Sequence, residues 1–260
     1  MYIRPVHAEL HIPTLHAFIR DNPLGQFTTS IAHPKYAKLQ TTHAPFIIDA
    51  IDGPTGDDGE EQDKGVLRAH IARANPHSKA IIDSLSESGQ DTLQEEVLVL
   101  FTSNTHSYIT PKYYVESKPK DGKVVPTWDY AAVQVYGKAR IYHRSADPLT
   151  GTFLQKQVEE LSEQNERRNL DKQGKTGERT WKVSDAPSKY VDLLKKAIVG
   201  IEIKIDRIEG RFKLSQESGD GDWQGVVNGF KSLGTEQGNA MAQLVENRGE
   251  NREVRQGAKQ

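Results

Sequence analysis

The sequence predicts a mainly β fold with flanking helices, built on an antiparallel sheet or barrel. Strand-like segments rich in β-branched and aromatic residues recur through the first 142 residues, and most connections between them are short and carry turn residues. Residues 133–141 also alternate. Valine, glycine, alanine and isoleucine occupy one face, and polar or aromatic residues occupy the other. This period of two is typical of a strand with one buried face.

The first half supplies most of the expected strands. A short helix over 12–20 has Pro13 in its first turn and ends before Pro23, where a helix does not continue easily. Strands are expected over 24–31, 40–51, 66–72 and 96–102, and a second helix over 77–86. An acidic, glycine-rich insert at 52–64 lacks the calcium-loop pattern and is expected to be a solvated hairpin tip.

The second half is expected to be mainly helical. Helices are predicted over 152–168, 187–198, 222–233 and 236–245. Gly200 is expected to end the helix of 187–198, and a strand with an isoleucine face follows it.

These elements suggest a domain organisation. We predict one barrel domain over residues 1–215, which includes a helical insert at about 147–198. A helical extension over 216–247 and a disordered tail over 248–260 complete the predicted chain.

Composition limits the possible functions. The chain has no cysteine, which excludes disulfides, thiolate metal sites and cysteine nucleophiles. Its formal net charge is −2 and its sequence pI is about 6.5, which counts against a dedicated nucleic-acid binder, although a dimer can concentrate charge locally. No phosphate-binding loop, dinucleotide fingerprint, serine nucleophile elbow or metal site is predicted. No segment approaches transmembrane length, so an intracellular protein is expected, cytoplasmic or, if regulatory, nuclear.

Arg68 and His70 are the first candidate functional residues. Residues two apart in a strand share a face, so these two potential cations project together, and a guanidinium matches phosphate as a fork. Arg73 and Asn75 follow where the strand leaves the sheet and add donors nearby. The alternative is a solvated Arg and His on the outside of a barrel, and spacing alone favours it.

The second group of candidates is aromatic. Trp128 and Tyr130 share a strand face, and Thr127 places a hydroxyl beside them. Such rings can form the wall of a planar ligand, and the hydroxyl can donate to it. Rings that only close the end of a barrel are the alternative. Tyr108, just after an apolar strand, and Trp181, before a predicted helix, complete the group.

Taken together, these segments resemble the FMN-binding negative transcriptional regulator (PaiB) family. The matching runs occur in the same order and cover most of residues 1–232. They are LHAFIRDNPLG, THAPFIID, LRAHIARANP, HSYITP, KVVPTWDY, WKVSDAP, AIVGIE and RFKLSQ. This chain departs from the pattern at Asp129, where the family usually has asparagine. The departure adds a negative charge near the expected anionic ligand.

The resemblance implies an antiparallel split β-barrel related to pyridoxamine-phosphate-oxidase-like flavoproteins. It also implies a homodimer that holds FMN at the subunit interface. It assigns Arg68, His70 and Arg73 to the phosphate with Asn75 near them, and Thr127, Trp128, Tyr108 and Trp181 to the surroundings of the flavin.

Three functions remain open at this point. The first is an FMN-binding homodimer with a regulatory role, in which direct DNA binding is left open. The second is an FMN-dependent oxidoreductase that acts on a small molecule, with catalytic residues unassigned. The third is a barrel without cofactor that serves only for interaction. No membrane partner is expected.

Overall fold

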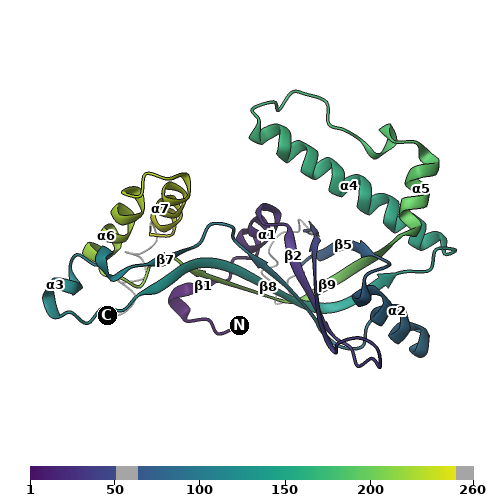
Figure 1. The fold of residues 1–260 in the computed structure, drawn as a ribbon, viewed down its shortest axis with the longest axis horizontal. Helices are drawn as coiled ribbons and strands as arrows, with labels where there is room; N and C mark the ends of the chain where they lie inside the picture. Colours follow the sequence, from purple (N-terminus) through teal and green to yellow (C-terminus); the bar gives the residue numbers. More distant parts are fainter. Residues whose placement is uncertain (51–63, 250–260) are drawn as a thin grey trace, which may run out of the picture. The chain divides into compact units, whose positions relative to one another are not determined.

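A computed structural model describes residues 1–50 and 64–249, and Figure 1 shows its helices and strands. The elements are η1 Pro5–His7, β1 Ala8–Glu9, α1 Ile12–Asp21, β2 Leu24–Ser30, β3 Leu39–Pro45, β4 Ile47–Asp49, β5 Val66–Ala72, α2 Pro76–Ser88, β6 Val97–Thr102, β7 Ser107–Ile109, η2 Pro111–Tyr113, α3 Ser117–Asp121, β8 Thr127–Tyr142, α4 Pro148–Lys172, η3 Val183–Asp185, α5 Ser188–Lys196, β9 Ile198–Lys213, α6 Asp220–Lys231 and α7 Glu236–Gly249. The expected hairpin tip falls on residues 51–63 and the tail falls mostly beyond Gly249, so both lie outside the described residues.

The chain forms two compact units. Unit 1 comprises Met1–Leu15, Thr102–Val133 and Glu209–Gln260, and unit 2 comprises His16–Phe101 and Gln134–Ile208. The predicted domain limits at residues 215 and 247 rest on sequence alone and stay a prediction.

Unit 2 contains the curled sheet. The strand order is β3-β2-β6-β8-β9-β5-β4, and the pairs β2–β3, β2–β6, β4–β5 and β5–β9 are antiparallel. Strands β3 and β4 form one run interrupted at Phe46, yet β3 pairs with β2 at one end of this order and β4 pairs with β5 at the other. Strand β3 also contacts β5. The sheet therefore curls back on itself, and the predicted antiparallel split barrel with flanking helices is confirmed.

Large apolar side chains fill the inside of the curled sheet. Phe27, Leu67 and Ile201 have no exposed surface, and the rings of Phe46 and Phe101 meet edge to face with centroids 5.6 Å apart. Burying residues of this size is the main source of stability in such a barrel.

The alternation predicted for 133–141 is confirmed in β8. Every second residue from Val135 to Ile141 is buried, whereas Tyr136, Lys138 and Arg140 are partly or fully exposed. Gly137 is needed on the buried face because an added Cβ would lie 2.1 Å from the carbonyl oxygen of Lys204.

The prediction that Gly200 ends a helix is wrong. Helix α5 ends at Lys196, and Gly200 lies inside β9, opposite His70. An added Cβ at Gly200 would lie 2.5 Å from the ring of Phe153. The glycine therefore makes room for α4 against the strand, which is a common reason for glycine within a sheet.

Unit 1 is built around a pair of C-terminal helices. Helices α6 and α7 pack on each other, and α6 also contacts η2. Ile109, Val226, Phe230 and Met241 are buried in their shared apolar cluster. Both helices are confirmed close to their predicted bounds. In the part of the chain that the structure describes, no helix is long and apolar enough to cross a membrane.

Candidate functional site

The eight predicted site residues are divided between the two units. Unit 2 holds Arg68, His70, Arg73, Asn75 and Trp181, and unit 1 holds Tyr108, Thr127 and Trp128.

Arg68 is the centre of an ion-pair cluster. Its side chain is almost fully buried under α4, and it donates to both oxygens of Asp49, from Nε at 2.5 Å and from Nη2 at 2.8 Å. It also donates to the carboxylate of Glu160 and, at 3.3 Å, to Oε1 of Gln157. Two carboxylates thus surround one guanidinium, and a phosphate would have to displace them. The phosphate role of Arg68 stays a prediction.

His70 shares the face of Arg68, as the sequence predicts. Burial lowers the pKa of His70, so its ring is uncharged at neutral pH and adds no positive charge to this face. Its Nδ1 is buried, and it has no hydrogen-bond partner among residues 1–50 and 64–249. The ligand role of His70 stays a prediction.

Arg73 and Asn75 both make contacts that support the fold. The Arg73 guanidinium donates to the carbonyl oxygens of Lys196 at 3.0 Å and His143 at 2.7 Å, so it joins the ends of α5 and β8. Asn75 is the N-cap of α2, where its Oδ1 accepts from the backbone N–H of His77 at 3.0 Å. These contacts account for the positions of both side chains without a ligand. The ligand role of Arg73 and Asn75 stays a prediction.

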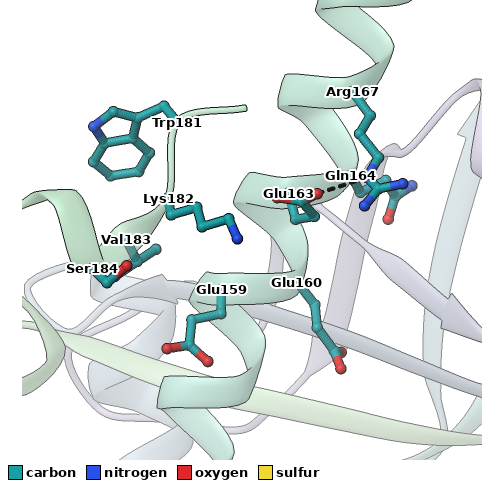
Figure 2. Close-up of a pocket in the computed structure, with 9 residues that line it drawn as sticks. All are labelled: Glu159, Glu160, Glu163, Gln164, Arg167, Trp181, Lys182, Val183 and Ser184. Carbon is teal, nitrogen blue, oxygen red and sulfur yellow. Dashed lines mark hydrogen bonds and ion pairs between the residues drawn. The ribbon is translucent and has the colours of Figure 1, made fainter. Parts of the chain in front are cut away.

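A pocket of about 580 Å³ lies between α4 and the segment that carries Trp181. Figure 2 shows Lys182 pointing from this segment toward α4, whereas the indole of Trp181 points away from the helix. The lining residues are Glu159, Glu160, Glu163, Gln164, Arg167, Trp181, Lys182, Val183 and Ser184. Its three carboxylates outnumber its two cations, which disfavours an anionic group in this pocket.

Unit 1 presents an exposed group of three rings. Tyr108 and Trp128 are directly paired across β7 and β8, and their ring centroids lie 6.3 Å apart at 65°. The indole Nε1–H of Trp128 donates to Nδ1 of His106 at 3.2 Å. Tyr108 is 49% exposed and Trp128 is 47% exposed. Two large rings held by a strand pair and left open to solvent can pack against a planar ligand.

The connection between β7 and β8 adds positive charge to the same unit. Residues 112–123 contain Lys112, Lys118, Lys120 and Lys123 against two acidic residues, and all four lysines are exposed. The net charge of the whole chain does not reveal this segment, because acidic residues elsewhere balance its four lysines. Thr127, at the end of this connection, pairs with Ile109 and is partly exposed.

Asp129 lies on the opposite side of β8 from Trp128. Its side chain has no exposed surface, and it accepts from Ser215 Oγ at 2.7 Å and from Lys213 Nζ at 3.4 Å. The expectation that Asp129 places a negative charge near the ligand is therefore not met at the Tyr108–Trp128 surface, because neighbouring residues of a strand face opposite ways.

The chain is similar in sequence to several known proteins. A family model described as "Putative FMN-binding domain" matches residues 1–207. A protein of Emericella nidulans described as uncharacterized is 52% identical over 255 residues, which cover 96% of this chain and 98% of that protein. The Bacillus subtilis protein named protease synthase and sporulation protein PAI 2 is 25% identical over 248 residues, which cover 95% of this chain and 98% of that protein.

Solved structures show weaker similarity. A conserved hypothetical protein, Rv2991 from Mycobacterium tuberculosis, matches with a TM-score of 0.45 and 12% identity, over 82% of this chain and 90% of that chain. The flavocytochrome Anf3 from Azotobacter vinelandii matches with a TM-score of 0.40 and 11% identity, over 86% of this chain and 78% of that chain. Similarities of this size say nothing about ligand or activity.

Proposed function

The chain belongs to the family described as FMN-binding domains, and from this premise we propose that it binds FMN against the exposed rings of unit 1. The observation that carries the proposal is the cross-strand pair of Tyr108 and Trp128, with His106 bonded to the indole. Planar aromatic ligands pack well on such rings. When bound, a flavin supplies hydride or electron transfer, and the protein supplies position and electrostatics.

The chemistry of unit 1 also fits the phosphate of FMN. The four exposed lysines of residues 112–123 provide ammonium groups for a dianion, whereas the Trp181 pocket in unit 2 is lined by three carboxylates. Thr127 directly precedes Trp128 in β8, so its side chain faces the other side of the strand, and its role near a flavin stays a prediction. The proposal therefore places the ring with Tyr108 and Trp128 and the phosphate with the lysines.

A homodimer with FMN at the subunit interface is the second part of the proposal. Val115 and Val125 are 59% and 74% exposed in the connection that carries the lysines, so unit 1 presents exposed apolar side chains in addition to its exposed rings. A second copy of the chain would cover them. A regulatory role through this dimer is the function that the resemblance implies.

Binding of FMN and of riboflavin to the purified protein tests the proposal. FMN should bind more tightly than riboflavin, which lacks the phosphate, and Trp128→Leu should weaken FMN by about tenfold, or about 1.4 kcal/mol. Trp181→Leu is the matched control because it removes an indole of similar exposure from unit 2. The proposal would be refuted if the protein bound neither flavin, or if only Trp181→Leu weakened FMN binding.

The dimer and the regulatory role have separate tests. Sedimentation velocity should show a dimer that becomes weaker when Val125 is replaced by aspartate, and a monomer at all concentrations would contradict the interface. A gel-shift assay on genomic fragments tests DNA binding directly. Bleaching of the bound flavin by NADH or NADPH would instead indicate an oxidoreductase.

A further inference from the structure

Asp129 is held inside unit 1 by the last residue of β9 and by the turn that follows it. Its Oδ2 accepts from Ser215 Oγ at 2.7 Å. The Lys213 ammonium lies 3.4 Å from its Oδ1 and also donates to the carbonyl oxygen of Trp128 at 3.1 Å. Both donors are buried or nearly so, because Ser215 is 3% exposed and the Lys213 side chain is 12% exposed.

The turn after β9 depends on these contacts. Ser215 has a φ of 57°, and it is the one residue other than glycine with a positive φ in residues 1–50 and 64–249. For a residue other than glycine, this left-handed backbone conformation costs free energy, which surrounding contacts must offset. Besides the bond from Ser215 to Asp129, the turn is held by Leu214 N–H, which donates to Oε1 of Gln216 at 2.6 Å. The turn then leads into α6.

Other titratable groups surround this cluster. Glu217 lies 3.7 Å from the Lys213 ammonium and 3.1 Å from Nε2 of His7. Burial lowers the pKa of His7, although Glu217 opposes the shift, so His7 does not provide a full second cation at neutral pH. Tyr114 faces Asp129 and Glu217 from the segment after η2. Burial first, and then these carboxylates and Asp222, raise its pKa to about 12.

The balance of charge in the cluster disfavours an ionised Asp129. When Asp129 is ionised, two carboxylates share the ammonium of Lys213 in a region with little water. Burial raises the pKa of Asp129 to about 6, against the opposing effects of Ser215 and Lys213. A neutral Asp129 leaves Lys213 to pair with Glu217 alone, and this arrangement balances the charges.

We propose that Asp129 is a proton-operated switch that sets the stability of unit 1. With a proton on Asp129 the buried cluster has balanced charges, and loss of that proton weakens the unit. Because the folded protein binds this proton more tightly than the unfolded chain does, the contribution to stability is complete below the ordinary pKa of 3.8 and is lost as pH rises through about 6.

Asp129→Asn is the variant that isolates this effect. An asparagine has the same shape, retains an acceptor for Ser215 and carries no titratable charge. It is also the residue usually present in the family that the chain resembles. Asp121→Asn makes the same change in net charge on an exposed side chain of unit 1 and is the matched control.

Denaturant unfolding between pH 4 and pH 8 is the first test, carried out on the full chain with Trp181 replaced by phenylalanine. The remaining tryptophans, Trp128 and Trp223, both lie in unit 1 and report its unfolding. Relative to Asp129→Asn, the unfolding constant of the parent should increase by about 100-fold across this range, from the difference between 3.8 and about 6. Parallel pH profiles for the two proteins would overturn the proposal.

Direct titration of the carboxyl group by ¹³C NMR is the second test and does not require Asp129→Asn to fold. One aspartate side-chain signal should titrate near pH 6. Its midpoint should move upward in Ser215→Ala, which removes a hydrogen bond to the ionised form. The absence of any aspartate signal that titrates above pH 5, or a midpoint that does not respond to Ser215→Ala, would contradict the assignment.

Discussion

Replacing Arg68 by methionine separates its structural role from its predicted ligand role. Methionine keeps an apolar stem of similar length but removes every donor to Asp49, Glu160 and Gln157. The substitution therefore leaves two carboxylates facing each other over a buried strand with no cation between them.

The expected loss of stability follows from burial. Removing one partner of a fully buried ion pair costs about 3–5 kcal/mol. Arg68 itself is 3% exposed, but the side chains of Asp49 and Glu160 are 41% and 45% exposed, so water can solvate them after the substitution. We therefore expect a loss at the lower end, about 3 kcal/mol in the free energy of unfolding.

Urea unfolding followed by circular dichroism measures this loss, and Glu160→Gln is the companion variant. Glu160→Gln leaves the two bonds from Arg68 to Asp49 in place, so it should cost no more than about 1 kcal/mol. If Arg68 binds the phosphate, Glu160→Gln removes a competing carboxylate and should tighten FMN while leaving riboflavin unchanged. If Arg68 is structural only, both affinities should stay the same.

Two results would refute this reasoning. A free energy of unfolding that is unchanged in Arg68→Met would show that the ion-pair cluster does not stabilise the barrel. A loss in Glu160→Gln as large as that in Arg68→Met would show that Asp49 does not hold the guanidinium by itself.

Three further predictions concern unit 2. His77 is buried, which lowers its pKa to about 4. Its contribution to the free energy of unfolding, about 3 kcal/mol, should be present above pH 6.5 and lost as pH falls toward 4. In His77→Gln, the free energy of unfolding measured against pH should lack this decrease. Gly137→Ala should destabilise the barrel by about 3 kcal/mol because the added methyl group meets the backbone of Lys204, and an unchanged melting temperature would contradict this close approach. Asn75→Ala should cost about 1 kcal/mol through loss of the α2 cap, measured by urea unfolding, whereas Asn75→Asp should retain most of that stability.

The pH dependences of the two units should have opposite signs. As pH falls from 6.5 to 4, His77 in unit 2 loses its contribution, whereas Asp129 in unit 1 gains one. Because the two effects oppose each other, stability measured against pH in the parent protein does not show which group titrates. Each variant is therefore compared with its parent.

Local pattern was sufficient to predict most of the elements. The alternation around Val135 predicted β8, and Pro13 predicted the first turn of α1. The exception at Gly200 arose because a glycine after a helical segment resembles a helix end, whereas the close contact with Phe153 is visible only in three dimensions.

The sequence by itself determined the strand content, the family and the pairing of Arg68 with His70 on one face. The strands and the shared face depend on residue spacing along a single segment, whereas the family depends on eight matching runs in the same order along the chain. Only the tertiary structure showed that α4 covers this face and brings Glu160 and Gln157 to Arg68. It alone showed that Trp128 stays exposed while Asp129, one residue later, is buried beside Lys213 and Ser215. The partners of a charged side chain come from distant parts of the chain, so the spacing that predicts its direction does not predict its charge balance or its availability to a ligand.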